Sequence, residues 1–130
     1  MALVLVIDDD GFYRSVLRRI LEREGHSVLE AEDGLEGLRL YRQYEPPLVI
    51  TDMNMPGIDG AEVIRSLRDI SRQVRIIAVS GISSFYNADL SEFSRRLGAD
   101  AVFRKLDPAE RIVAETKRFL ESPTVDAEAV

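Results

Sequence analysis

The 130-residue chain contains no cysteine and a single histidine, His26, which we interpret as structural. Disulfide bonds, cysteine-based zinc sites and paired-histidine metal sites are therefore excluded, and the lack of cysteine is consistent with a cytoplasmic protein. No apolar run approaches the roughly 20 residues that span a bilayer. The first ten residues, MALVLVIDDD, carry no basic segment and end in three acids. We therefore expect neither a signal peptide nor membrane insertion.

The chain also lacks an excess of positive charge. Its 17 Lys and Arg residues are outnumbered by 23 Asp and Glu residues, for a formal net charge of −6. We therefore expect no direct binding of nucleic acid. Four of the acids follow apolar runs, namely Asp8, Asp9, Asp10 and Asp52, and without them the chain would be close to neutral. The sequence therefore predicts that much of the charge asymmetry gathers in one place.

Short apolar runs rich in β-branched residues alternate with helical patterns along the chain. Such runs are typical of strands buried on both faces, and they predict strands at residues 2–7, 27–31, 48–51, 74–79 and 101–104. The helical patterns predict helices at about 12–24 and 35–44, one through residues 63–70, one ending near residue 97, and one beginning near residue 108. The residues expected to face the core from these helices include Phe12, Leu17, Leu21, Leu35, Leu38, Tyr41, Val63, Ile64, Leu67, Ile70, Leu90, Phe93, Leu97, Ile112 and Val113.

Five strand–helix units in about 120 residues predict an α/β fold with helices on both faces of a parallel sheet. The economical arrangement is a flavodoxin-like, doubly wound, five-stranded sheet in the order 2-1-3-4-5 with five surrounding helices. We expect one domain over residues 1–121. The last nine residues, SPTVDAEAV, hold too little apolar surface to pack, so we expect a short flexible tail at 122–130.

Polar residues follow the predicted strands at their carboxyl ends, where ligands bind in sheets of this kind. The first strand runs into the acids at 8–10, the third ends at Asp52, the fourth at Ser80 and the fifth at Lys105. Neighbouring carboxylates repel one another unless a cation neutralises them, and carboxylate oxygens suit Mg²⁺. A lysine and a hydroxyl beside them would bind a phosphoryl group, and a carboxylate can itself form an aspartyl phosphate.

Four motifs, VLVIDDD, VITDMNMPGIDG, IIAVSG and GADAVFRK, occur in this order over about residues 2–121. Together they resemble the motifs of a response-regulator receiver domain of two-component signalling. The resemblance implies that Asp52 is the phosphoacceptor, that Ser80 is the switch hydroxyl that hydrogen-bonds the phosphoryl group, and that Lys105 pairs with that group. It also implies a magnesium site formed by Asp8, Asp9, Asp52 and the backbone carbonyl of Asn54, with Asp9 a direct ligand.

The same resemblance implies partners. A sensor histidine kinase or a histidine phosphotransfer protein would donate the phosphoryl group, and a downstream protein partner would read the altered surface. We expect a phosphoacceptor rather than an enzyme, acting as a stand-alone receiver or as one excised from a longer regulator. Two other functions stay open: a haloacid-dehalogenase-like phosphatase, suggested by DDDGF and AVSG, and a phosphorylation-independent interaction module.

Three positions depart from the pattern of the family. Leu106 follows Lys105 where proline is usual, and Val102 stands where an aromatic residue is usual, with Phe103 beside it. The stretch from 80 to 98 is longer than common, and we expect its aromatic pair at 85–86 to begin the buried stripe of a helix. Ile82, two residues past the switch hydroxyl, cannot hydrogen-bond a water molecule, which predicts slow to moderate self-dephosphorylation.

Overall fold

A computed structural model describes residues 2–81, 92 and 94–121 of the chain. Its core is one parallel sheet in the order β2-β1-β3-β4-β5, as the sequence predicts. The strands are β1 (Leu3–Ile7), β2 (Ser27–Ala31), β3 (Leu48–Asp52), β4 (Arg75–Ser80) and β5 (Ala101–Arg104). The expectations for Ile82, for the aromatic pair at 85–86, for Leu90 and Phe93, and for the tail at 122–130 lie outside the described residues.

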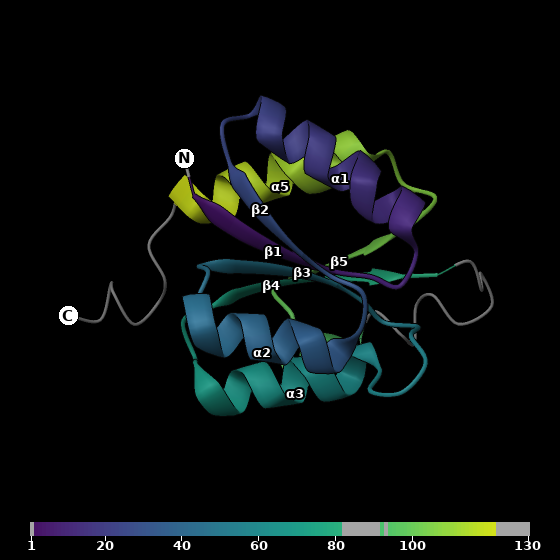
Figure 1. Cartoon of the computed structure of the whole chain (residues 1–130), viewed down its shortest axis with the longest axis vertical. Coiled ribbons are helices and arrows are strands. Elements are labelled where there is room, and N and C mark those ends of the chain that lie inside the picture. The colour runs from purple at the N-terminus through teal and green to yellow at the C-terminus, as the bar shows by residue number, and fades with distance from the viewer. Residues whose placement is uncertain (1, 82–91, 93, 122–130) are drawn as a thin grey trace.

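Helices cover both faces of this sheet, which confirms the predicted doubly wound fold. Figure 1 shows α1 and α5 on one face and α2 and α3 on the other. Their bounds are α1 (Gly11–Arg23), α2 (Gly34–Tyr44), α3 (Gly60–Ile70) and α5 (Ala109–Glu121). Residues 94–97 are helical as well, where the sequence predicts the end of the remaining helix. Over the described part of the chain, no helix is long and apolar enough to cross a membrane.

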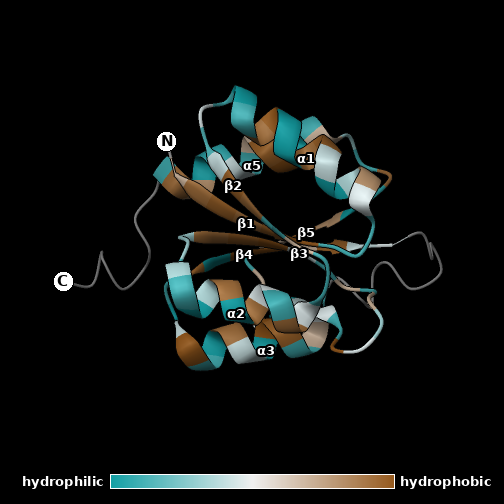
Figure 2. Cartoon of the chain, in the orientation of Figure 1, coloured by the Kyte–Doolittle hydropathy of each residue, from teal (hydrophilic) through white to brown (hydrophobic). Residues whose placement is uncertain are grey.

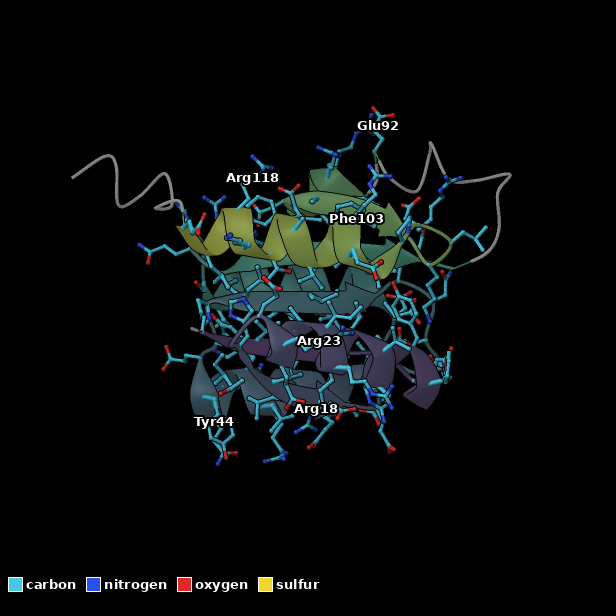
Figure 3. All side chains as sticks on the ribbon, turned by 90° about the horizontal axis from the view of Figure 1, so that it is seen from above. Arg18, Arg23, Tyr44, Glu92, Phe103 and Arg118 are labelled. Atoms are coloured by element: carbon cyan, nitrogen blue, oxygen red, sulfur yellow. The ribbon has the colours of Figure 1, made fainter. Side chains whose placement is uncertain are left out.

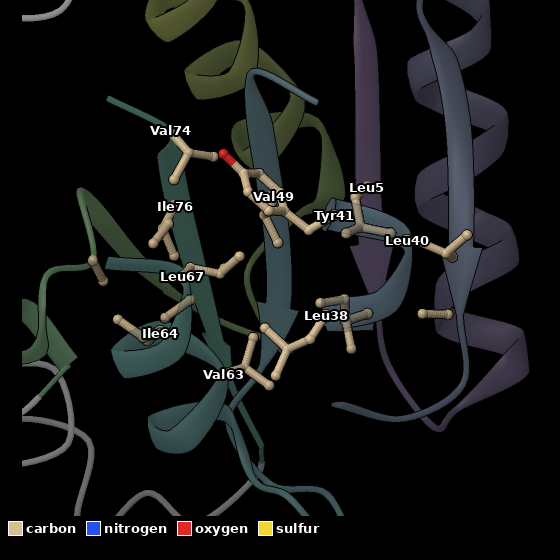
Figure 4. Packing of buried hydrophobic residues seen from close by; sticks show 14 of the residues in the cluster. Leu5, Leu38, Leu40, Tyr41, Val49, Val63, Ile64, Leu67, Val74 and Ile76 are labelled. Carbon is tan, nitrogen blue, oxygen red and sulfur yellow. The ribbon is translucent and has the colours of Figure 1, made fainter. Parts of the chain in front are cut away.

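The core has two apolar layers, one on each face of the sheet (Figure 2). Alternate residues of a strand point to opposite faces, so Leu5 joins the layer under α2 and α3 while Val4 and Val6 join the layer under α1 and α5. Figure 4 shows the first layer, in which Leu38 and Tyr41 of α2 and Leu67 of α3 pack against the strands. Charged side chains such as Arg18 and Arg118 project outward (Figure 3).

Three residues that the helical periodicity places in the core are exposed instead. Phe12 is 79% exposed, and Leu35 and Ile70 are also on the surface. Phe12 and Leu35 lie in the first turns of α1 and α2, and Ile70 is the last residue of α3. The apolar pattern therefore continues into terminal turns in which these side chains are no longer covered by the sheet or by a neighbouring helix.

Three aspartates cap the starts of helices. The Asp10 carboxylate accepts hydrogen bonds from the backbone N–H groups of Phe12 and Tyr13, and Asp33 and Asp59 cap α2 and α3 in the same way. These contacts satisfy N–H groups that have no partner within the helix. Asp10 thus serves as a helix cap, and it does not belong to the group that the carboxylates of Asp8, Asp9 and Asp52 form at the ends of the strands.

The parallel register aligns the carboxyl ends of the central strands. Ile7 pairs with Thr51, Asp52 with Val79, and Ser80 with Arg104. β3 and β4 each extend one residue further than the sequence predicts, so Asp52 and Ser80 are the last residues of their strands. The polar residues that follow the strands in the sequence are thereby gathered along one edge of the sheet.

Candidate functional site

Three carboxylates meet at the carboxyl edge of the sheet, between β1 and β3. Oxygen atoms of Asp8, Asp9 and Asp52 all lie within 4.8 Å of one another, an arrangement that could hold a metal ion. Asp8 and Asp52 are buried, at 2% and 3% exposure, whereas Asp9 is exposed. The structure therefore brings together the three acids that the sequence predicts, with one of them open to solvent.

Lys105 reaches this acidic group from the end of β5. Its Nζ atom lies 3.0 Å from each carboxylate oxygen of Asp8 and 3.4 Å from Oδ2 of Asp52. The backbone N–H of Lys105 donates to the carbonyl of Ser80, and the Asp107 carboxylate accepts from the backbone N–H of Arg104, which closes the turn. The replacement of the usual proline by Leu106, which is exposed, therefore leaves Lys105 at the site.

Burial and the neighbouring charges shift the pKa values of two groups at this edge. Burial raises the pKa of the Asp52 carboxyl to about 6; the backbone N–H of Asn54 acts against this shift, the Asp8 carboxylate adds to it, and Lys105 opposes it. Burial lowers the pKa of Lys105, but its hydrogen bond to Asp8 and the charge of Asp52 outweigh burial and raise that pKa overall. At neutral pH, Lys105 is thus a charged ammonium group, and the Asp52 carboxyl is mostly ionised.

Asn54 and Ser80 complete the edge around Asp52. The backbone N–H of Asn54 donates to Oδ1 of Asp52 at 3.1 Å, and its side-chain Oδ1 accepts from the N–H of Gly81 at 2.9 Å. The buried hydroxyl of Ser80 donates a long hydrogen bond of 3.5 Å to the carbonyl of Phe103. Asn54 therefore ties the loop after β3 to the end of β4, and the Ser80 hydroxyl is held only loosely.

The loop between β3 and α3 depends on the small size of one residue. A Cβ atom at Gly60 would lie 2.4 Å from the backbone oxygen of Asp52 and 2.5 Å from the Cα of Met53. The backbone N–H of Gly60 donates to the carbonyl of Met53 at 3.3 Å. Glycine is required at this position because the start of α3 passes directly against the strand end that presents Asp52.

Two residues of α1 contribute to the site although sequence analysis did not single them out. The Arg14 guanidinium donates to the carbonyl of Asp8 at 2.7 Å and pairs with Glu30 of β2 at 2.8 Å. The Tyr13 ring lies against Lys105, with its centroid 4.9 Å from Nζ. Burial raises the pKa of the Tyr13 hydroxyl to about 12, and the charges of Asp8, Asp107 and Asp52 add to this shift. The only signal in the sequence is that both residues closely follow the acidic run.

The position of the usual aromatic residue is filled by Val102, and its neighbour cannot replace it. Val102 packs against the core layer under α2 and α3, whereas Phe103 packs against the layer under α1 and α5. Arg111 of α5 lies over the Phe103 ring at 5.9 Å. Because consecutive strand residues point to opposite faces, an aromatic side chain at 103 cannot occupy the space available to one at 102.

The fold and this acidic edge together define a class of protein, and comparison with known sequences agrees. Residues 4–117 match the family described as the response regulator receiver domain, so the chain belongs to that family. Receiver domains are phosphoacceptor signalling domains of two-component systems and not classical enzymes. The family assignment removes the haloacid-dehalogenase-like phosphatase that the sequence left open.

Individual relatives are similar over most of the chain. The chain is 29% identical to the sporulation initiation phosphotransferase F of Bacillus subtilis, over 90% of this chain and 92% of that protein. It is 35% identical to the response regulator MprA of a Mycobacterium species over 95% of its length, but this spans only 52% of MprA. Among solved structures, a response regulator receiver domain protein from Clostridium thermocellum superposes with a TM-score of 0.85 and 28% identity, over 93% of this chain and 95% of the other.

Proposed function

We propose that the chain accepts a phosphoryl group on Asp52 and thereby switches a protein-interaction surface. The observation that carries the proposal is the setting of the Asp52 carboxylate, which is buried, faces Lys105 at 3.4 Å and shares its edge with Asp8 and Asp9. A carboxylate in this setting has an ammonium group beside it that can bind the oxygens of an incoming phosphoryl group.

We further propose that the acidic group holds Mg²⁺ through Asp8, Asp9, Asp52 and the backbone carbonyl of Asn54. The donors fit this ion because all of them are oxygens. Among the described residues, three carboxylates gather here with one ammonium group, so the edge has an excess of negative charge. A bound Mg²⁺ would supply charge compensation for the phosphoryl oxygens.

The residues of the chain have distinct tasks in the transfer. One oxygen of Asp52 attacks phosphorus in line with the leaving group, so a carboxylate O–P bond forms while the bond between phosphorus and the donor breaks. Lys105, which now bridges Asp8 and Asp52, pairs with the transferred oxygens. Ser80 exchanges its 3.5 Å hydrogen bond to Phe103 for one to the phosphoryl group. The added charge then biases an equilibrium between two surface conformations.

We propose that the donor is a sensor histidine kinase or a histidine phosphotransfer protein and that a downstream protein partner reads the modified state, in the cytoplasm. Two large apolar side chains are exposed close in the sequence to the acids and to Lys105, and a donor docked at the acidic edge would cover them. Phe12 comes shortly after the acids that follow β1, and Leu106 comes directly after Lys105; they are 79% and 70% exposed. The chain would act alone or as the receiver of a longer regulator.

Incubation with acetyl phosphate and Mg²⁺, followed by intact-protein mass spectrometry, tests the proposal. We expect the mass to increase by one phosphoryl group, and we expect no increase for Asp52→Asn or when the metal is chelated. The surviving alternative, a phosphorylation-independent interaction module of receiver fold, predicts no mass increase for the unmodified chain. An increase that persists in Asp52→Asn would mean that another residue is the acceptor.

A further inference from the structure

The Tyr13 ring is the only aromatic ring recorded against Lys105 in the part of the chain that the structure describes. Tyr13 lies in the first turn of α1, its ring is half-buried, and its centroid is 4.9 Å from Nζ of Lys105. The hydroxyl of Tyr13 is buried and has no hydrogen-bond partner among the described residues. The contact of this side chain with a charged group is therefore made by its ring and not by its hydroxyl.

The ring is held in place independently of Lys105. The backbone N–H of Tyr13 donates to the Asp10 carboxylate that caps α1, at 3.3 Å. The side chain packs against the core layer formed by residues such as Leu17 and Ile112. A ring fixed by a helix cap and by the core offers the negative face of its π-system at a constant position, and this face attracts a cation.

The attraction of the carboxylates for Lys105 depends on what else they bind. In the structure the ammonium group contacts Asp8 and Asp52. A divalent cation at the acidic group, or a phosphoryl group on Asp52, would reduce the negative charge that these two residues present to Lys105. The Tyr13 ring is neutral and is not among the oxygen ligands of such a cation, so its attraction for the ammonium group would persist.

We propose that Tyr13 is a positioning residue that keeps the ammonium group of Lys105 at the acidic edge when the carboxylates are engaged by a cation or a phosphoryl group. This inference rests on the proposed function, because it assigns Tyr13 a role in phosphoryl transfer to Asp52. Tyr13 acts through Lys105 and makes no bond to the reacting atoms. A cation–π contact of this kind corresponds to about a fivefold change in an equilibrium or a rate.

NMR of the protein labelled with carbon-13 at the lysine Cε atoms tests the contact without any phosphoryl donor. The chain has two lysines, and Lys117 lies exposed on α5, where it serves as an internal reference. We expect the Lys105 Cε protons to be shifted upfield of those of Lys117 by the Tyr13 ring current, both without and with Mg²⁺. The shift should remain in Tyr13→Phe and disappear in Tyr13→Leu. A Lys105 signal that coincides with Lys117 once Mg²⁺ is added would overturn the proposal.

The rate of phosphorylation by acetyl phosphate at saturating Mg²⁺ tests the functional consequence. We expect Tyr13→Leu to be about fivefold slower and Tyr13→Phe to match the unmodified chain. Phe119→Leu is the matched control, because Phe119 packs against the same core layer but contacts Arg75 and Arg118 in place of Lys105. In a Lys105→Met background, Tyr13→Leu should have no further effect.

Two outcomes of the rate measurement would contradict the proposal. If Tyr13→Phe is as slow as Tyr13→Leu, the hydroxyl and not the ring is what matters. If Tyr13→Leu is slow in the Lys105→Met background too, Tyr13 acts through packing alone. The failure of the proposed function would look different: the unmodified chain would then gain no phosphoryl group at all, while the ring-current shift of Lys105 would still report the contact.

Discussion

At the amino end of the sheet, the Asp100 carboxylate faces two guanidinium groups, those of Arg68 at 2.9 Å and Arg75 at 3.4 Å. It also accepts a hydrogen bond from the backbone N–H of Ile76 at 2.8 Å. At the carboxyl end, Lys105 is the one ammonium group among the described residues that pairs with Asp8 and Asp52, and Asp9 lies beside these two acids. The negative charge of Asp100 is thus compensated by its partners, whereas the three acids at the carboxyl end keep an excess of negative charge.

This difference distinguishes charged residues that hold the fold together from charged residues at the candidate site. The remaining donors of Arg68 go to backbone carbonyls of the segments before β4 and β5, including those of Gly98 and Val74, so the network at the amino end is closed. The carboxyl end keeps an excess of carboxylate and an acid whose pKa burial raises to about 6. The closed network holds segments of the fold together, whereas the uncompensated carboxylates are stabilised when a cation binds or when one of them is neutralised.

The largest effect on stability is expected when the network around Asp100 loses one of its two arginines. Arg68→Met should lower the free energy of unfolding by about 3 kcal/mol, because it removes one partner of the Asp100 carboxylate and leaves the Gly98 and Val74 carbonyls without this donor. Urea unfolding measures the loss.

Arg65→Met is the control for this substitution. Arg65 also lies on α3, but its contact with Glu62 is 3.6 Å long and exposed. The free energy of unfolding should therefore change by less than about 0.5 kcal/mol. The phosphorylation rate of folded Arg68→Met should stay normal. Equal stability losses for the two variants would contradict the structural role given to the amino end.

A smaller effect of opposite sign is expected at the carboxyl end. Asp52→Asn should stabilise the metal-free protein by about 2 kcal/mol at pH 7, since the raised pKa means that the ionised Asp52 destabilises the fold. This cost is fully present above the folded-state pKa of about 6, and it is relieved as the pH falls toward the lower pKa of the unfolded chain.

The difference in stability between the two proteins should therefore shrink between pH 7 and pH 4. Urea unfolding of both proteins across this range measures it. Titrating groups that the two proteins share, such as His26, cancel in the comparison. A destabilised Asp52→Asn at pH 7, or a difference that is independent of pH, would show that the Asp52 charge is already compensated.

The smallest of these effects is the stabilisation by Mg²⁺. At tenfold above its dissociation constant the ion should add about 1.4 kcal/mol to the free energy of unfolding, if it binds only the folded chain. Thermal unfolding with and without Mg²⁺ measures this gain. Asp9→Asn should lose most of it, whereas Asp69→Asn, which removes an exposed acid of α3, should keep it. Equal gains in both variants would argue against the acidic edge as the binding site.

The fold was predictable because both of its signals are local. Buried strands appear in the sequence as short apolar runs, and helices appear as apolar residues at helical spacing. Both patterns can be recognised in one sequence. The prediction that Phe12, Leu35 and Ile70 are buried is wrong because they lie in the terminal turns of helices. There the apolar spacing continues, but no neighbouring element of the described chain covers the side chains. The end-of-strand acids, Ser80 and Lys105 were predictable because parallel strands place their carboxyl ends together.

Other parts of the site were not predictable because they depend on side-chain directions in three dimensions. The contact of Tyr13 with Lys105 joins residues from opposite ends of the chain. The hydrogen bond from Gly81 to the Asn54 side chain depends on how two loops approach each other. Only the geometry of α1 shows that Asp10 caps this helix and does not join the acidic group. A strand-end pattern indicates which residues are near one another but not which atoms meet.

Chemical mapping of the phosphoryl group tests whether the uncompensated edge makes Asp52 the phosphoacceptor. Borohydride reduces an aspartyl phosphate to homoserine, which peptide mass spectrometry can locate in the sequence. After treatment with acetyl phosphate, we expect homoserine at position 52, and only when Mg²⁺ is present. Homoserine at position 8 or 9, or none at any position while the protein is folded and Mg²⁺ is bound, would contradict it.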